Sequence, residues 1–196
     1  MLSTLVLILI VAVGWYVYAS TQSANTTVPS VVYAKLNTSQ GTIEVELYQS
    51  KTPKTVTNFV NLARSAFYDN LVWHRIIKGF VIQTGDPNTR TGDRSTWGQG
   101  GSSQTVPLEI DNSLHNNVGY LGMAHATDPN SGSSQFYINL VDNTSLDGGY
   151  TVFGKVVSGM DVAFAIANVP TYTQGPYKDQ SIDPVLLTSV TISSSR

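Results

Sequence analysis

The chain has 196 residues and a formal net charge of −2, with 41% apolar and 12% charged residues, which suits one folded domain with an appendage. Lys and Arg are few and do not cluster, so a nucleic-acid partner is not expected. Cysteine is absent and the three histidines lack the spacing of metal ligands, which excludes disulfides and argues against a metal site.

The segment Leu2–Ala19 is uncharged and predominantly apolar, and the first charged side chain of the sequence is that of Lys35. As a helix rising ~1.5 Å per residue it would be about 27 Å long, close to the thickness of a bilayer core. Three aromatic residues cluster near its end, where such rings favour the membrane interface. Most cleaved signal peptides have a Lys or Arg before the apolar run, and this chain has none there. A small-residue cleavage motif does, however, end at Ala19. We therefore expect residues 1–19 to form a hydrophobic helix that is a membrane anchor, or a signal segment if it is cleaved.

Residues 20–30 (STQSANTTVPS) are polar and uncharged, which is typical of a flexible linker. The folded domain is expected to span residues 31–196. With an anchor at residues 2–19, this domain would lie outside the cytoplasm, at a cell surface or in a periplasm. It would be secreted if the segment is cleaved.

The domain opens with two runs of strand character, Val31–Asn37 and Thr42–Tyr48. In the second run Ile43, Val45 and Leu47 alternate with polar residues, which places the three apolar side chains on one face. The four residues between the runs suit a turn, so the sequence predicts a β-hairpin with one buried face.

A helix is predicted to begin at Pro53, with Thr52 as its capping residue. Apolar residues recur at helical spacing between Val56 and Ala63, so one stripe of this helix should cover a core. A second, shorter helix is predicted at Met160–Ala167.

Short apolar runs separated by glycine-rich turns indicate six further strands. With the hairpin they make eight, and many short strands with few helices are typical of a closed antiparallel barrel, which leaves no exposed edges. The fold class is therefore mainly β, a closed eight-stranded antiparallel β-barrel with two flanking helices, preceded by the N-terminal hydrophobic helix. The six further runs are Val72–Ile77, Phe80–Thr84, Tyr120–Ala124, Gln135–Leu140, Val152–Val157 and Val185–Ile192.

Three segments carry a more specific signal: residues 73–86 (WHRIIKGFVIQTGD), residues 122–138 with GMAH and GSSQFYI, and residues 146–156 (LDGGYTVFGKV). In order and spacing they resemble the H-R-I-I-x-G-F-x-x-Q-x-G-D, M-A-x-A…S-Q-F-F-I and L-D-G-x-x-x-V-F-G-K-V blocks of cyclophilins. The resemblance extends over residues 31–196, and Tyr150 is similar to bacterial members, since eukaryotic ones usually have His there. It implies a cyclophilin-like barrel and a monomeric peptidyl-prolyl cis/trans isomerase that acts on proline-containing polypeptides without a cofactor.

Rotation about an X-Pro bond breaks amide resonance against a barrier of ~20 kcal/mol, and it requires no nucleophile, base or metal. The twisted state gains a lone pair on the prolyl nitrogen, which a fixed cationic donor can stabilise. The resemblance assigns that donor to Arg75, whose orientation Gln83 would fix. The turn Lys78-Gly79 would bring these two residues together.

The resemblance also assigns the substrate-binding residues. Tyr137 stands where most members have Phe, and its hydroxyl needs a polar partner if it is buried. The glycine-rich segment 87–101 is predicted to be a loop at the rim of the groove. The substrate-binding residues implied are Phe80, Val81, Ala124, His125, Gln135, Tyr137, Leu146 and Tyr150.

Two functions remain open from the sequence alone. The first is an isomerase that assists the folding of extracytoplasmic polypeptides. The alternative is a module or chaperone that binds proline-containing segments with little turnover. Arg75 favours the enzyme, because a pure binder needs no cationic donor, whereas the Tyr137 hydroxyl keeps the binder possible.

Overall fold

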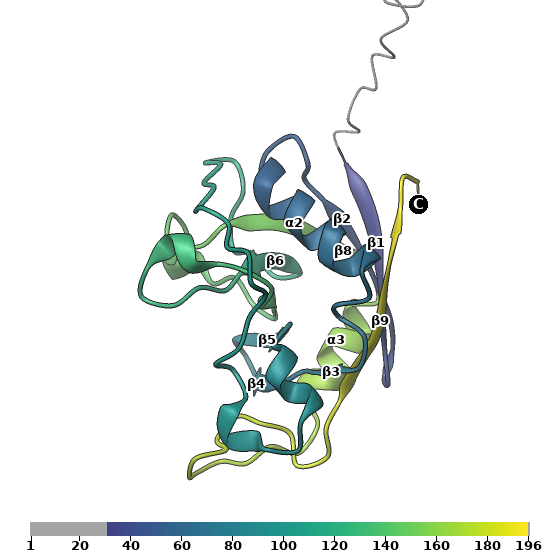
Figure 1. Ribbon diagram of the computed structural model, residues 1–196, viewed down its shortest axis with the longest axis vertical. Helices are drawn as coiled ribbons and strands as arrows, with labels where there is room; N and C mark the ends of the chain where they lie inside the picture. The colour runs from purple at the N-terminus through teal and green to yellow at the C-terminus, as the bar shows by residue number, and fades with distance from the viewer. Residues whose placement is uncertain (1–30, 196) are drawn as a thin grey trace, which may run out of the picture.

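A computed structural model describes residues 31–195 of the chain, and the predicted N-terminal helix and linker lie outside them. The described part forms one antiparallel sheet of nine strands, with two α-helices and four short 3-10 helices (Figure 1). The strands are β1 (Val32–Thr38), β2 (Gly41–Leu47), β3 (Leu71–Val72), β4 (Arg75–Ile77), β5 (Val81–Thr84), β6 (Tyr120–Met123), β7 (Phe136–Asn139), β8 (Val152–Ser158) and β9 (Leu186–Ser193). The helices are α2 (Pro53–Arg64), α3 (Met160–Ala167), η1 (Pro87–Arg90), η2 (Arg94–Thr96), η3 (Pro129–Ser131) and η4 (Thr144–Leu146).

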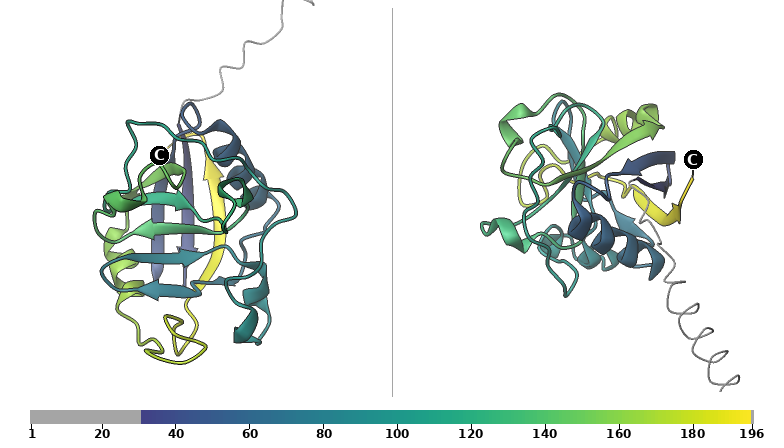
Figure 2. Two further views of the ribbon diagram at one scale, coloured as in Figure 1. Left: turned by 90° about the vertical axis from the view of Figure 1, so that its left-hand side faces the viewer. Right: turned by 90° about the horizontal axis from the view of Figure 1, so that it is seen from above.

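The sheet has the strand order β3-β9-β1-β2-β8-β6-β7-β5-β4 and curls on itself. The left view of Figure 2 shows β4, β5, β6 and β7 running across the direction of β1, β2 and β9. Helices α2 and α3 lie at opposite ends of this curled sheet, and both bury residues in the core inside it. The arrangement is mainly β and cyclophilin-like, as the sequence predicts.

The closed eight-stranded barrel is a wrong prediction, because the hydrogen-bonded order has two ends, at β3 and β4. The single strand expected at 72–77 divides at Trp73 and His74. Its first part pairs with β9 and its second part with β5, so no ladder closes the sheet. Trp73 and His74, both buried, connect β3 at one edge of the sheet to β4 at the other edge covalently, without strand pairing.

The first hairpin is confirmed, with β1 paired to β2 from Val32 opposite Leu47 to Thr38 opposite Gly41. Its alternating apolar residues, Ile43, Val45 and Leu47, are fully buried in the main core. That core lies inside the curl, where Phe59 of α2 packs against aromatic rings from the sheet. A period-two pattern is thus sufficient to fix which face of these strands is buried.

Helix α2 begins at Pro53 and α3 spans Met160–Ala167, as predicted. Thr52 occupies the N-cap position of α2, but its side chain makes no capping hydrogen bond, so that expectation is wrong. The Glu109 carboxylate accepts instead from the backbone N–H groups of Lys54 (3.1 Å) and Thr55 (2.8 Å). A side chain distant in sequence therefore satisfies the first turn of this helix.

No helix among residues 31–195 is both long and apolar enough to cross a membrane.

Candidate active site

The candidate site is built on one row of residues that crosses four neighbouring strands. Arg75 of β4 lies opposite Gln83 of β5, which lies opposite Tyr137 of β7, which lies opposite Gly122 of β6. Residues directly opposite in a sheet project from the same face, so this register places the three side chains together. The turn at Gly79 (φ 74°) makes the β4–β5 pairing possible, as predicted.

The adjacent row points the other way and anchors the site in the core. Ile76, Ile82, Ile138 and Leu121 are opposite one another on the same four strands, and each is buried in the main core cluster. The strands therefore alternate between a core face and a site face. The apolar row holds the polar row rigidly in place.

A chain of hydrogen bonds links the polar side chains of the site. Nη1 of Arg75 donates to Oε1 of Gln83 (3.2 Å), and Nε2 of Gln83 donates to Oε1 of Gln135 (2.8 Å). Nε2 of Gln135 in turn donates to the carbonyl oxygens of Gly98 (3.0 Å) and Gly100 (2.7 Å). The guanidinium of Arg75 is thus oriented by a relay that ends in the 87–101 loop.

A cavity of about 190 Å³ opens beside this relay. Apolar and aromatic side chains form most of its wall, and the Arg75 guanidinium carbon lies 5.8 Å from the centre of the Phe80 ring. Nine of the ten residues predicted for the site line it. They are Arg75, Phe80, Val81, Gln83, Ala124, His125, Tyr137, Leu146 and Tyr150.

The tenth, Gln135, lines a second cavity of about 270 Å³. The two cavities share Gln83, Ala124 and His125 as lining residues, so they adjoin. The second is bordered by residues 98–101, which confirms that the 87–101 segment forms a rim. The arrangement is a groove with two adjoining hollows.

Tyr137 forms the buried floor of the first cavity. Gly122 lies against its ring, and a Cβ atom at that position would overlap the ring, so only glycine fits there. The Tyr137 hydroxyl donates to Oδ1 of Asn116 (2.8 Å) and therefore has the polar partner that it requires. Burial raises the pKa of Tyr137 far above its ordinary value, which keeps the hydroxyl protonated as a donor.

His125 and Tyr150 form one wall, with their rings stacked at 4.4 Å between centroids. The His125 ring nitrogens contact the carbonyl oxygens of Ala126 (2.6 Å) and Gly149 (2.7 Å). The histidine therefore connects the two chain segments on either side of the cavity. Its contacts are those of a structural partner, in keeping with a reaction that needs no acid or base.

Two side chains near the site are absent from the sequence-based prediction. His74 is buried directly before Arg75, and Asn116 is buried behind Tyr137. Asn116 lies outside the three motif segments, and no pattern in the sequence links it to position 137. Among the described residues, no group of three or more His, Asp or Glu could hold a metal ion.

Comparison with known proteins decides the family. Residues 33–192 match the family model "cyclophilin type peptidyl-prolyl cis-trans isomerase/CLD". The chain belongs to the cyclophilin family. Among relatives, a peptidyl-prolyl cis-trans isomerase of Acinetobacter baylyi is 40% identical over 82% of this chain and 85% of its own length. Peptidyl-prolyl cis-trans isomerase B of Escherichia coli is 38% identical over 80% of this chain and 97% of its own.

Solved structures agree with the sequence comparisons. A cyclophilin-type isomerase of Cryptosporidium parvum superposes with a TM-score of 0.76 at 31% identity, over 85% of this chain and 99% of its own. A second crystal structure of that protein, obtained in the presence of the dipeptide Ala-Pro, gives a TM-score of 0.74 at 32% identity. The present chain is thus a cyclophilin-type peptidyl-prolyl cis-trans isomerase.

The groove of this cyclophilin suits the physical demands of amide rotation. An apolar hollow bounded by aromatic rings can grip a prolyl ring, and a fixed guanidinium at its edge can donate toward a twisted peptide. The relay through Gln83 and Gln135 restricts the guanidinium before substrate arrives. Pre-organised donors of this kind lower a barrier without any covalent step.

Proposed function

We propose that this cyclophilin accelerates X-Pro isomerisation in polypeptides outside the cytoplasm and thereby assists their folding. Uncatalysed isomerisation takes tens to hundreds of seconds, which is slow enough to limit folding. The observation that carries the proposal is the Arg75–Gln83–Gln135 relay at the edge of an apolar cavity. A module that only held proline segments would not require such a fixed cation.

In the proposed mechanism the prolyl ring enters the cavity above Tyr137, between Phe80 and Leu146. Arg75 then donates to the prolyl nitrogen as it becomes pyramidal, and Gln83 maintains the direction of the guanidinium. The second cavity, beside Gln135, would accept the residues before proline. The contacts that orient Arg75 in this mechanism are already formed in the free protein.

The same geometry weakens the case for a binder without turnover. That alternative depended on the Tyr137 hydroxyl at the floor of the pocket, which needs a polar partner. The hydroxyl is bonded to Asn116 behind the pocket, so the ring presents an apolar surface, much as phenylalanine would.

Replacement of Arg75 tests the mechanism. We expect Arg75→Ala to lower kcat/KM by about tenfold or more in a protease-coupled assay on an Ala-Pro peptide. Arg75→Lys should recover little, because a point charge cannot bond Gln83 and the substrate with one planar fork. Circular dichroism should show both variants folded, since Arg75 is partly exposed. Near-full activity of Arg75→Ala would contradict the mechanism.

The proposed location rests on the uncharged, predominantly apolar segment Leu2–Ala19. Membranes carrying the full chain should retain it after alkaline carbonate extraction, and protease added from outside should digest the domain. A soluble product beginning at Ser20 would favour cleavage and secretion. A full-length product in the cytosolic fraction would contradict both versions.

A further inference from the structure

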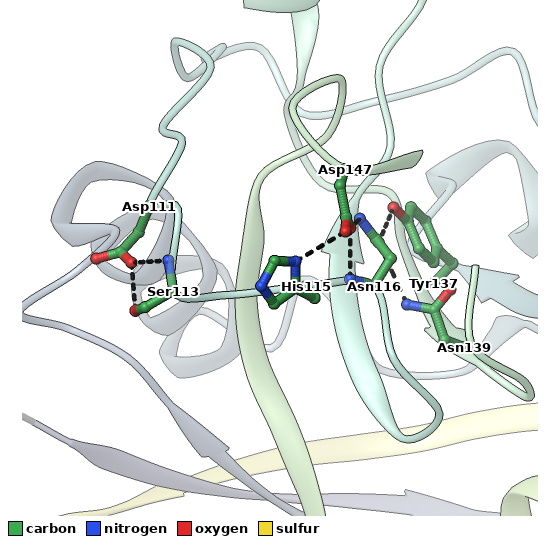
Figure 3. Close-up of polar contacts among 7 residues, drawn as sticks. All are labelled: Asp111, Ser113, His115, Asn116, Tyr137, Asn139 and Asp147. Atoms are coloured by element: carbon green, nitrogen blue, oxygen red, sulfur yellow. Dashed lines mark hydrogen bonds and ion pairs between the residues drawn. The ribbon is translucent and has the colours of Figure 1, made fainter. Parts of the chain in front are cut away.

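Asn116 is a fully buried side chain that lies behind the prolyl cavity and lines neither of the two hollows. It belongs to an irregular segment before β6. Figure 3 shows it between Tyr137 on one side and Asp147 on the other, with dashed contacts to both. It therefore contacts two parts of the cavity wall that are separate in the sequence.

Its first contact fixes the floor of the cavity. Oδ1 of Asn116 accepts from the Tyr137 hydroxyl (2.8 Å) and also from Nδ2 of Asn139 (3.3 Å). The ring of Tyr137 has Gly122 directly against it, so it cannot move toward that strand. Without an acceptor behind it, the buried hydroxyl would be unpaired, and the ring would lose the contact that fixes its position in the floor of the cavity.

Its second contact fixes the outer wall. One oxygen of Asp147, Oδ1, accepts from the backbone N–H (2.7 Å) and from Nδ2 (3.0 Å) of Asn116. The other oxygen, Oδ2, lies 2.9 Å from Nδ1 of His115. Asp147 directly follows Leu146 and precedes Tyr150 by three positions, and both of those residues line the cavity. The Asp147 carboxylate thus bonds the loop of residues 146–150, which forms part of the cavity wall, to the same buried asparagine, Asn116.

Asp147 is an ionised carboxylate at neutral pH. Although its partial burial opposes ionisation, the hydrogen bonds from Asn116 and His115 hold the pKa of Asp147 below its ordinary value. The two donations from Asn116 therefore go to a charged acceptor, and hydrogen bonds to charged groups are stronger than neutral ones.

We propose that Asn116 is a positioning residue of the isomerase, which sets the width of the prolyl cavity by holding Tyr137 and the 146–150 loop at a fixed separation. The inference rests on the proposed function, because it concerns the same cavity. Asn116 does not touch substrate; it acts through Tyr137 and Asp147.

The test is a double-mutant cycle with two readouts. Asn116→Ala, Tyr137→Phe and the double variant are compared with the unaltered chain for kcat/KM on an Ala-Pro peptide and for binding of that peptide by NMR titration. We expect Asn116→Ala to lower kcat/KM about tenfold and to weaken binding in the same direction. In the Tyr137→Phe background the loss should shrink by about threefold or more, because no hydroxyl remains to be left unpaired.

A matched control separates positioning from stability. Glu109→Ala removes the carboxylate that accepts from the first turn of α2 and that lines neither cavity, so it should lower the melting temperature while kcat/KM of the folded protein stays unchanged. All assays are made well below the melting temperature of each variant. Asn116→Ala with unaltered kcat/KM and unaltered binding, or an equal loss in both Tyr137 backgrounds, would overturn the inference.

A second variant covers the case in which Asn116→Ala does not fold. Asp147→Ala removes the wall contact at a partly exposed position and should lower kcat/KM by about threefold, mainly through a higher KM. Unchanged kinetics in that variant would overturn the inference as well. If the unaltered chain shows no turnover, the proposed function fails, while the binding measurements still test Asn116.

Discussion

Tyr137 occupies a position where cyclophilins usually have phenylalanine, and its environment explains how the chain tolerates the extra oxygen. The hydroxyl is directed to Asn116 and the ring to the cavity, so the same side chain satisfies a buried donor and an apolar surface. The sequence predicts the need for a partner but cannot identify it, because Asn116 lies outside the matching segments and comes close to Tyr137 only in the folded chain.

The other site residues were predictable for a different reason. Arg75, Gln83 and Tyr137 belong to segments whose order and spacing match cyclophilin blocks, and the register of β4, β5 and β7 then aligns them in one row. Whether each acts in the assigned role remains a prediction. Their convergence on one cavity is an observation.

His74 gives a prediction on pH and stability at the scale of one residue. Its side chain is 4% exposed, and burial, together with the nearby Arg75 charge, lowers the pKa of His74 to about 4 despite the opposing charge of Asp86. In the unfolded chain a histidine titrates near ~6.5. Between these values the unfolded state binds more protons, so the free energy of unfolding falls as pH falls, by about 2 kcal/mol from pH 7 to pH 5.

Urea unfolding at pH 7 and pH 5 measures that difference. The His74→Gln variant should lose most of this pH dependence, whatever its stability at pH 7. His115→Gln, at an exposed position, should retain it. Equal pH dependence in the unaltered chain and His74→Gln would show that another group is responsible.

At the scale of elements, the start of α2 shows what local patterns can and cannot predict. Pro53 marks the first helical residue correctly, because proline suits that position wherever it occurs. The prediction of Thr52 as the capping residue was wrong, because the group that accepts from the first turn is the carboxylate of Glu109. Glu109 lies far away in sequence, whereas a local pattern favours the adjacent Thr52. Long-range contacts of this kind depend on the assembled fold.

Removing this cap should have a measurable cost. Glu109→Ala leaves the N–H groups of Lys54 and Thr55 without their carboxylate acceptor. We expect the free energy of unfolding to fall by about 1–2 kcal/mol, as for other helix caps. Asp161→Ala is the matched control: it removes the same charge from an exposed position in the first turn of α3 and should cost about 0.5 kcal/mol or less. Similar losses in the two variants would contradict the capping role.

On the scale of the whole molecule, the mainly β class and the two helices were predictable, whereas closure of the sheet was not. Strand character in residues 72–77 is continuous in the sequence, and nothing local indicates a break at Trp73. The break arises because residues on either side of it pair with different partners, β9 and β5. Counting apolar runs gives the number of strands approximately, but their order depends on pairing across the chain.

The pairing of the first and last strands has a practical consequence. β1 runs beside β9 with Tyr33 opposite Ser193, so the two points where the described domain starts and finishes adjoin. In Figure 1 both strands lie to the right of β4, β5 and β6, which carry much of the catalytic face. A short peptide could therefore join β9 to β1, and new termini could be opened in the exposed stretch 173–176. The resulting circular permutant would keep every strand pairing that forms the groove, so the enzyme could be inserted into another protein with its catalytic face outward.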